Sequence, residues 1–419
     1  MLIKKKVLNN LFVFILIVGV LTVSLATIAS TMPVAAKDVP SHIILTWTGD
    51  ARTTQTITWQ TDANTQDGQV QYWEVRPGHL GEQINLAAQV KTVVSNKGEF
   101  NVHTATITGL KPGTRYAYRI GIPGTWSQQA HFATAPVTGG EFKFLVFGDS
   151  QSINYDTWRT TLHNAYQANL DTAFFINMGD LIDMGQDYSQ WDAWFNATQG
   201  VLENIPCMPV VGNHETYAPE RRLAMPTLFT DQFKLPMNGP EGLKGQVYSF
   251  NYADVHFVML DTQIDEEGRF VPDMLEKQKH WLEEDLATAG EKWKLVFVHK
   301  APYNNKPNGN PTIRTGFAPI IEKYHADLVF TAHDHVYAHT YPMYNGMAVE
   351  NPTKGTIYVA TGRSGSKTYS TSIAKEWDDF FYNPLDEPNY LTVEVNDNIL
   401  TVTAYRQNGG LIDKWSIVK

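Results

Sequence analysis

The chain has 419 residues, with 33 Lys and Arg against 43 Asp and Glu, and its formal charge is −10. Hydrophobic residues make up 43% of it, which excludes general disorder, and the acidic balance argues against a nucleic-acid-binding protein. The single cysteine, Cys207, excludes an intrachain disulfide framework and a multi-cysteine zinc site. A chain of this length is expected to form two domains.

The N-terminus has the layout of a secretory signal peptide. Lys4, Lys5 and Lys6 precede an apolar run over residues 11–28, and the small residues 34–36 offer a cleavage site. We expect cleavage after Ala36, so that residues 1–36 are removed and no stable membrane span is left. The alternative is an uncleaved anchor, because the apolar run is long enough to cross a bilayer. The protein is thus expected to be secreted or at the cell surface, and the lack of disulfides fits a bacterial exterior.

Residues 37–136 are predicted to form an all-β domain. The segments 43–47, 55–60 and 69–73 alternate between apolar and polar residues, as half-buried strands do. The segment from Leu110 to Tyr116 resembles the tyrosine corner of fibronectin type III domains, in which the Tyr116 hydroxyl would bond back to the backbone. We predict a fibronectin type III-like sandwich that serves as a scaffold and carries no chemistry.

From residue 141 to 419 the pattern changes to strands alternating with helices, which indicates an α/β sheet. Helices are expected at about 156–168, 189–200, 274–289 and 318–324. Strands are expected at 142–147, 173–178, 209–211, 255–260, 294–298 and 327–330. Beyond Tyr390, amphipathic strands joined by Asn- and Gly-containing turns predict an antiparallel meander that closes the domain.

Five of these predicted strands are followed by Asp, Asn or His, residue types that commonly bind metals. Because ligands collect at the carboxyl ends of strands in open α/β sheets, these side chains are expected to share one crevice. Carboxylates and amides mixed with imidazoles favour ions such as Mn, Fe, Zn or Ni. Each motif alone is weak, since Gly-Asp pairs mostly make turns, but the conjunction predicts a metal site. The segments are Gly148–Gln151, Gly179–Asp183, Gly212–Glu215, His299 and Ala332–His335.

The order of these motifs resembles that of the calcineurin-like metallophosphoesterase superfamily, and the preceding β domain is most similar to the purple acid phosphatase branch. The resemblance implies a four-layer α/β/β/α sandwich with two metal ions about 3.5 Å apart. It also implies that Asp180 bridges both metals and that Asp149 and His335 complete one site. The other site would then be completed by Asn213, His299 and His333.

The same resemblance implies hydrolysis of a phosphoester by in-line attack of a metal-bridging hydroxide. His214 is the candidate donor of a proton to the leaving group, because the family places this histidine over the phosphoryl group. Purple enzymes have a metal-binding Tyr at the position of Asp183. We therefore predict a colourless enzyme in which Asp183 pairs with His214, against the alternative of a solvated turn residue.

Gln151 is a second departure from the family pattern, since many members have a metal-binding His there. An amide oxygen is a poorer ligand than imidazole for a transition metal. The first site is therefore expected to bind metal weakly, to use Gln151 or water, or to prefer a harder ion, and the metals are expected to be Fe, Mn, Zn or similar.

Substrate recognition is predicted from the loop that follows His299. Tyr303 and Asn304, together with Arg314, are candidates for contact with a phosphate, although a solvated basic loop is the alternative. The leading prediction is a secreted phosphomonoesterase that acts on a small-molecule phosphoester. A phosphodiesterase or nucleotide hydrolase on the same core is an alternative within the enzyme class. A cell-surface binding protein with a degenerate site, suggested by Gln151, is the alternative from another class.

Overall fold

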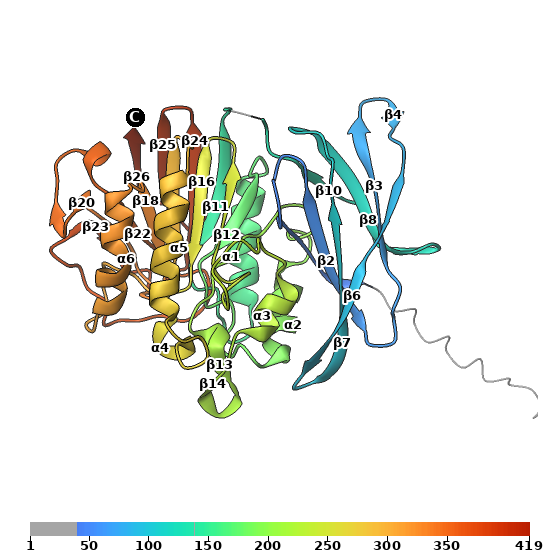
Figure 1. The fold of residues 1–419 in the computed structure, drawn as a ribbon, viewed down its shortest axis with the longest axis horizontal. Helices are drawn as coiled ribbons and strands as arrows, with labels where there is room; N and C mark the ends of the chain where they lie inside the picture. Colours follow the sequence, from blue (N-terminus) through green and yellow to red (C-terminus); the bar gives the residue numbers. More distant parts are fainter. Residues whose placement is uncertain (1–39, 138) are drawn as a thin grey trace, which may run out of the picture. The chain divides into compact units, whose positions relative to one another are not determined.

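The computed structural model describes residues 40–137 and 139–419, so the signal peptide predicted for residues 1–36 lies outside the described residues (Figure 1). The described part begins with an all-β domain of two antiparallel sheets. One sheet has the order β1 (Ser41–Thr46), β2 (Gln55–Asp62), β7 (Gly98–Ile107) and β6 (Gln89–Ser95). The other joins β10 (Ala130–Ala133), β8 (Arg115–Ile122) and β3 (Gln69–Arg76), with short β4 (His79–Leu80), β5 (Ile84–Ala87) and β9 (Thr125–Trp126) at its edges.

The predicted tyrosine corner of this domain is confirmed. Tyr116 is buried in the sandwich core, and its hydroxyl accepts a hydrogen bond from the backbone N–H of Lys111 at 3.0 Å. The ring of Tyr116 stacks on Phe132, which belongs to the neighbouring strand β10. The alternating segments of the sequence thus form strands whose apolar faces make one core.

The second domain is built on two sheets. The first has the order β12 (Phe174–Asn177), β11 (Phe142–Phe147), β24 (Asn389–Asn396), β25 (Ile399–Arg406) and β26 (Leu411–Val418), and the last three strands are the predicted antiparallel meander. The second has the order β15 (Tyr248–Tyr252), β16 (Val255–Leu260), β17 (Trp293–Val298), β18 (Leu328–Thr331), β22 (Ile357–Thr361), β19 (Tyr337–Thr340) and β23 (Asp378–Tyr382). Two short pairs lie apart, β13 (Tyr217–Ala218) with β14 (Arg222–Leu223) and β20 (Met343–Tyr344) with β21 (Met347–Ala348).

Aromatic side chains fill the space between these two sheets. Phe144 and Phe174 of the first sheet pack edge-on against Phe257 of the second, with ring centroids 5.4 and 5.5 Å apart. Helices cover the outer faces of the two sheets. Trp158 of α1 packs against Phe147 of the first sheet, and Leu282 of α5 lies in one hydrophobic cluster with residues of the second. The layers are therefore α/β/β/α, as predicted.

The helices of this domain are α1 (Asp156–Ala168), α2 (Tyr188–Thr198), α3 (Thr227–Gln232), α4 (Ile264–Glu267), α5 (Met274–Thr288) and α6 (Pro311–Lys323). Helix α6 begins seven residues before the predicted start at 318. Its first turn is favoured by Pro311 at the first helical position and by the Asn310 side chain, which accepts the Ile313 N–H. In the described part of the chain, none of the helices combines the length and the apolar character needed to cross a membrane.

The strand predicted at residues 209–211 is wrong. The segment runs beside β12, and Met208 and Val210 donate hydrogen bonds to Phe175 and Asn177 at 3.0 and 2.8 Å. Pro209 between them has no N–H, and only one isolated bridge forms, between Phe175 and Cys207. The segment is therefore extended and ends at the predicted place, but it is not a strand of the sheet.

The two domains are joined along β1. The backbone N–H of Cys207 donates to the carbonyl of Leu45 at 2.9 Å, and the N–H of Leu45 donates to Leu202 at 3.3 Å. Just after β1, the fully buried Trp47 packs against Phe174 with ring centroids 5.3 Å apart. The β domain thus contributes an aromatic side chain to the core of the α/β domain.

Candidate metal centre

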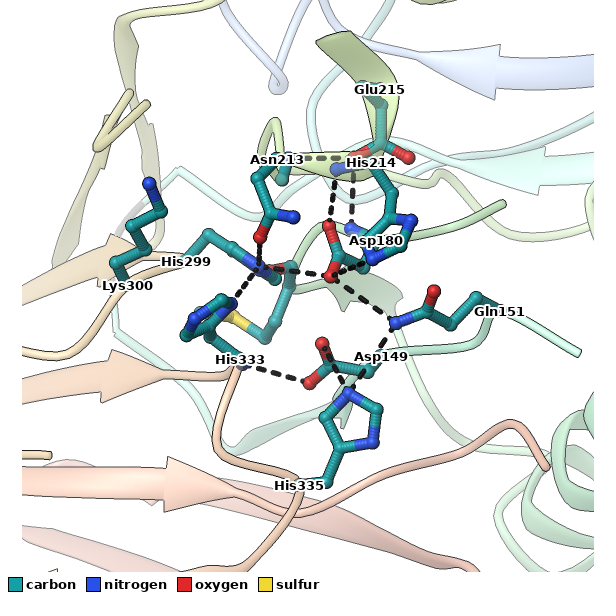
Figure 2. A network of polar contacts seen from close by, with 12 residues as sticks. Asp149, Gln151, Asp180, Asn213, His214, Glu215, His299, Lys300, His333 and His335 are labelled. Carbon is teal, nitrogen blue, oxygen red and sulfur yellow. Dashed lines mark hydrogen bonds and ion pairs between the residues drawn. The ribbon is translucent and has the colours of Figure 1, made fainter. Parts of the chain in front are cut away.

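The polar residues that follow the strands converge, although they come from two different sheets. Asp149 follows β11 and Asp180 follows β12 in the first sheet, whereas His299 follows β17 and His333 follows β18 in the second. Figure 2 shows these side chains pointing toward one another, with His335 and Asn213 beside them. The crevice is therefore formed where the strand ends of both sheets meet.

Two groups of side chains in this cluster are suited to hold a metal ion. Asp180, His299 and His333 form one group, and Asp149, Asp180 and His335 form the other, with the ligand atoms of each within 4.8 Å of one another. The Nε2 atom of His299 lies 3.3 Å from Asp180 Oδ2, and that of His335 lies 3.2 Å from Asp149 Oδ1. Asp180 belongs to both groups, as a residue that bridges two ions must.

The orientation of the side chains fits two bound cations. The Nδ1 atoms of His299 and His335 bond to the carbonyls of Met178 and Lys367, at 2.8 and 2.7 Å, so Nε2 is the ring atom that faces a carboxylate and that would bind a cation after losing its proton. The amide nitrogen of Asn213 donates to Tyr217, which turns the Asn213 oxygen toward His299 Nε2 at 3.2 Å. The buried Asp149 Oδ1 accepts no hydrogen bond from any described residue. Such a set of acceptors without donors suits cations.

The backbone at the cluster is held in an uncommon conformation. Asp180, His333 and His335 have φ angles of 49°, 68° and 57°, in the left-handed region that residues other than glycine seldom adopt. Such strain persists only where the surrounding structure enforces it, and it concentrates at functional sites. The observation supports a functional role for this cluster independently of its residue types.

Glu215 fixes the turns that carry Asp180 and Asn213. It is fully buried, and its carboxylate accepts backbone N–H groups from Asp180, Leu181 and Gly212 at 2.9, 2.8 and 2.7 Å. A Cβ atom at Gly212 would collide with the backbone and the carboxylate of Asp180. The glycine is therefore required for close approach of the two turns.

The charged side chains of the cluster shift the pKa values of one another. Burial disfavours the charged form of Asp180, but the neighbouring His299 and His214 hold the pKa of this carboxyl well below its usual range. Burial likewise opposes the charge of His299, and Asp180 still raises the pKa of this imidazole to about 9. Burial, with Lys306 nearby, lowers the pKa of His333 well below its usual value. The carboxylate of Asp180 thus stays ionised, which a bridging ligand requires.

His214 and Asp183 lie beside the cluster. The Nδ1 atom of His214 is 2.7 Å from the backbone carbonyl of Asp183 and 3.3 Å from its carboxylate oxygen. The backbone carbonyl is thus the nearer acceptor, and the Asp183 side chain is 54% exposed. Because Nδ1 donates to an oxygen, it carries the proton in this arrangement, and Nε2 is left to interact with other groups.

Lys367 is a residue of this site that the sequence did not predict. Its ammonium nitrogen lies 3.0 Å from His214 Nε2 and 3.2 Å from both Asp183 Oδ1 and Gln151 Oε1. Burial opposes its charge, but Tyr369, Asp183 and Asp180 raise the pKa of this amine. A lysine in the long segment between β22 and β23 has no motif around it, and thus only the folded structure brings it to the site.

Gln151 is buried between the cluster and Lys367. Its amide nitrogen lies 3.3 Å from Asp180 Oδ2 and 3.4 Å from His335 Nε2, and its oxygen accepts a hydrogen bond from Lys367. The oxygen therefore points away from the carboxylates in this arrangement. The amide would have to turn over to become a metal ligand, and it would then lose the bond from Lys367.

Two of the residues predicted for substrate contact belong elsewhere. Tyr303 is a core residue, since it is 5% exposed and its hydroxyl lies 3.4 Å from Glu322. The guanidinium of Arg314 lies over the rings of Tyr303 and Trp377, at 3.9 and 4.4 Å from their centroids. Cation–π packing and burial therefore account for both residues. Asn304, the third candidate, lines a cavity that also borders His333.

Comparison with known proteins agrees with this fold and site. Residues 40–134 match the family model of the purple acid phosphatase N-terminal domain, and residues 142–337 match that of the calcineurin-like phosphoesterases. The two matches occur in the same order as the two domains of the structure. Residues 142–337 thus form a domain of the calcineurin-like phosphoesterases, a family of metal-dependent phosphoric ester hydrolases, and the domain before it is of the purple acid phosphatase N-terminal type.

Individual relatives support the same classification. The chain is 25% identical to acid phosphatase type 7 of Mus musculus over 369 residues, and this aligned region covers 80% of each protein. It is 25% identical over 334 residues to a purple acid phosphatase of Glycine max, over 74% of this chain and 69% of that protein. A purple acid phosphatase from yellow lupin seeds has the same fold, with a TM-score of 0.78 and 20% identity over 91% of this chain and 74% of the lupin chain.

Proposed function

We propose that this protein is a secreted phosphomonoesterase that depends on two metal ions and acts on small organic phosphates. The observation that carries the proposal is the pair of ligand groups that share the buried carboxylate of Asp180. Asp149 and His335 would complete one metal site, and the other would be completed by Asn213, His299 and His333. Secretion is proposed from the signal-like segment at residues 1–36.

The residues of the site have separable roles in this proposal. When bound, the two cations would supply Lewis acidity and lower the pKa of an attacking water. The chain itself holds the ligands in place, because backbone carbonyls orient His299 and His335 and because Glu215 secures the Asp180 turn. The ligand set is thus assembled before substrate arrives.

We assign His214 as the residue that gives a proton to the leaving oxygen. Its Nδ1 is committed to the Asp183 carbonyl, so Nε2 is the atom available for this transfer. For this transfer the imidazole must carry a second proton on Nε2, which solvent would return after each turnover. Lys367 lies 3.0 Å from Nε2. The Lys367 ammonium would stabilise negative charge on the phosphoryl oxygens.

Two alternatives lead to different experimental outcomes. A phosphodiesterase would use the same ligands but prefer a diester, and a degenerate surface-binding protein would hydrolyse neither class of substrate. Because Asp183 occupies the position of the metal-binding tyrosine of purple enzymes, we propose that the protein is colourless. The intact set of ligands around Asp180 favours an active enzyme over a degenerate one.

The test measures hydrolysis of 4-nitrophenyl phosphate and bis(4-nitrophenyl) phosphate by metal-stripped protein after addition of Mn, Fe, Zn, Ni, Mg or Ca. We expect metal-dependent hydrolysis, a higher kcat/KM for the monoester, and a loss of more than about a hundredfold in Asp180→Asn. Asp171→Asn, at a side chain that is 71% exposed, is the matched control. No turnover with any metal, in protein shown to be folded by circular dichroism, would refute the proposal.

A further inference from the structure

A polar cavity opens beside the metal centre. It has a volume of about 330 Å³, and His333 and Asp334 form its border with the cluster. The remaining wall comes mainly from the segment 300–312, which joins β17 to α6. A cavity of this size holds a small organic group, and its position places that group next to a phosphate at the metals.

The wall of this cavity presents polar side chains that are not engaged. Asn308 and Thr312 are exposed, and their side chains make no hydrogen bond to any described residue. Asn304 uses one amide N–H to bond the Lys306 carbonyl at 2.9 Å, and its oxygen accepts no hydrogen bond from the residues that the structure describes. A side chain at Gly309 would collide with that oxygen. Amides and hydroxyls of this kind pair with the hydroxyl groups of a ligand.

The charges of the cavity disfavour a second anionic group on the ligand. Lys300 is paired with Glu266, whose two oxygens lie 2.8 and 2.7 Å from its ammonium, while the exposed Asp265 has no cationic partner among the described residues. Lys306 forms no ion pair within the described part of the chain, and its ammonium lies 4.4 Å from the ring of Tyr369, which packs on His335. The unpaired cation therefore lies on the side of the cavity near the metal centre, where the phosphate would sit, and the wall also carries an unpaired carboxylate.

The side chains of the wall also disfavour a nucleobase. No Phe, Tyr or Trp is among the described residues that line the cavity, so the aromatic platform on which a base would stack is missing there.

We infer that this cavity binds the alcohol part of the substrate, and that this part is a neutral polyol or sugar. The inference rests on the proposed phosphatase function and names its substrate class. Asn304, Asn308, Thr312 and Asp265 bind the hydroxyl groups, and Lys306 contacts the phosphate. A site that hydrogen-bonds substrate hydroxyls discriminates against analogues without them, because its polar groups are then left unpaired.

The test compares glycerol 3-phosphate with n-butyl phosphate, which are similar in size but differ in hydroxyl groups. We expect kcat/KM to be at least about tenfold higher for glycerol 3-phosphate. In the double variant Asn308→Ala/Thr312→Val this ratio should fall toward one, whereas Asn64→Ala, at an exposed turn of the β domain, should keep it. Saturation-transfer NMR with sorbitol, which needs no turnover, should detect binding that the double variant weakens.

The outcomes separate this inference from the function on which it rests. Hydrolysis of 4-nitrophenyl phosphate together with equal use of the two alkyl phosphates would overturn the inference and leave the phosphatase function intact. The same inference would be overturned by an unchanged ratio and unchanged sorbitol binding in the double variant. A protein that hydrolyses none of the three esters would refute the phosphatase function, and the sorbitol signal would still report on the cavity.

Discussion

At the scale of single residues, Lys367 is the least expected part of the site. Its ammonium contacts His214, Asp183 and Gln151, which come from three different turns. Two of these, Asp183 and Gln151, occupy the positions at which the sequence departs from the family pattern. The structure thus places a positive charge between both departures, and we interpret it as a charge that acts on the phosphate in addition to the metals.

Lys367→Met should lower kcat/KM for 4-nitrophenyl phosphate by about a hundredfold, because a donor to the phosphoryl oxygens and to His214 is lost. The bound metal should not change, since the substitution keeps the backbone carbonyl of Lys367 that orients the ligand His335. Lys367→Arg should restore part of the activity. Lys354→Met, at an exposed lysine, is the control, and a Lys367→Met enzyme as active as the control would refute the assigned role.

At the scale of elements, the end of β16 contains a buried pair of carboxyl groups. Asp261 and Glu267 share one amide, since the Gln246 nitrogen lies 3.0 Å from Asp261 Oδ2 and 2.7 Å from Glu267 Oε2. Gln278 of α5 holds the Asp261 backbone by two hydrogen bonds of 2.9 and 2.7 Å. Burial raises the pKa of Asp261 to about 6 and raises that of Glu267 well above its usual value. The folded protein therefore favours a proton on this pair.

This pair should make the free energy of unfolding depend on pH. Because the pKa is raised in the folded state, the stability that protonation contributes is fully present below about pH 4. This contribution is lost as the pH rises through about 6 and above. Glu267→Gln keeps the shape of the side chain but does not titrate. The free energy of unfolding of the variant, relative to that of the wild type, should therefore be about 1–3 kcal/mol higher at pH 8 than at pH 5. Urea unfolding of metal-stripped protein at both pH values measures this difference, with the exposed Glu350→Gln as control. Parallel changes in the wild type and both variants would contradict the prediction.

The sequence predicts elements well where a local pattern decides the structure and poorly where tertiary contacts decide it. The helices at 156–168 and 274–288 and the final meander follow from periodicity and turns. The segment 209–211 was predicted as a strand from its apolar residues, but it is only extended beside β12, where Met208 and Val210 donate single hydrogen bonds. The early start of α6 depends on capping by Asn310, which is visible in the sequence but is outweighed by the periodicity of the residues that follow.

The same division holds for the candidate site. The ligand cluster was predictable because each member follows a strand and because strand ends converge. Lys367 and Lys306 act through contacts between segments far apart in the chain, so spacing carries no signal for them. Glu215 lies within a predicted motif, but its hydrogen bond to the Asp180 turn depends on the fold. Tyr303 and Arg314 were predicted for substrate contact because a basic loop after a ligand is compatible with substrate contact or with packing. The burial of Tyr303 and the position of Arg314 over its ring favour packing.

At the scale of the whole molecule, the β domain supports the element that leads to the site. The side chain of Gln60 accepts a hydrogen bond from the Tyr188 hydroxyl at 2.6 Å and donates one to Gln232 at 2.7 Å. Tyr188 begins α2, which follows the turn that holds Asp183. The sandwich thus carries no metal ligand among its described residues, but it packs on the segment that carries part of the site.

The central claim is that the chain holds two metal ions through one shared carboxylate. The most direct measurement is the metal content of protein without residues 1–36, loaded with Zn or Mn, dialysed and analysed by inductively coupled plasma mass spectrometry. We predict about two ions per chain for the wild type and for Asp171→Asn, and a loss at both sites in Asp180→Asn. Fewer than one ion per chain in the folded wild type, or an Asp180→Asn variant that retains both ions, would contradict the claim.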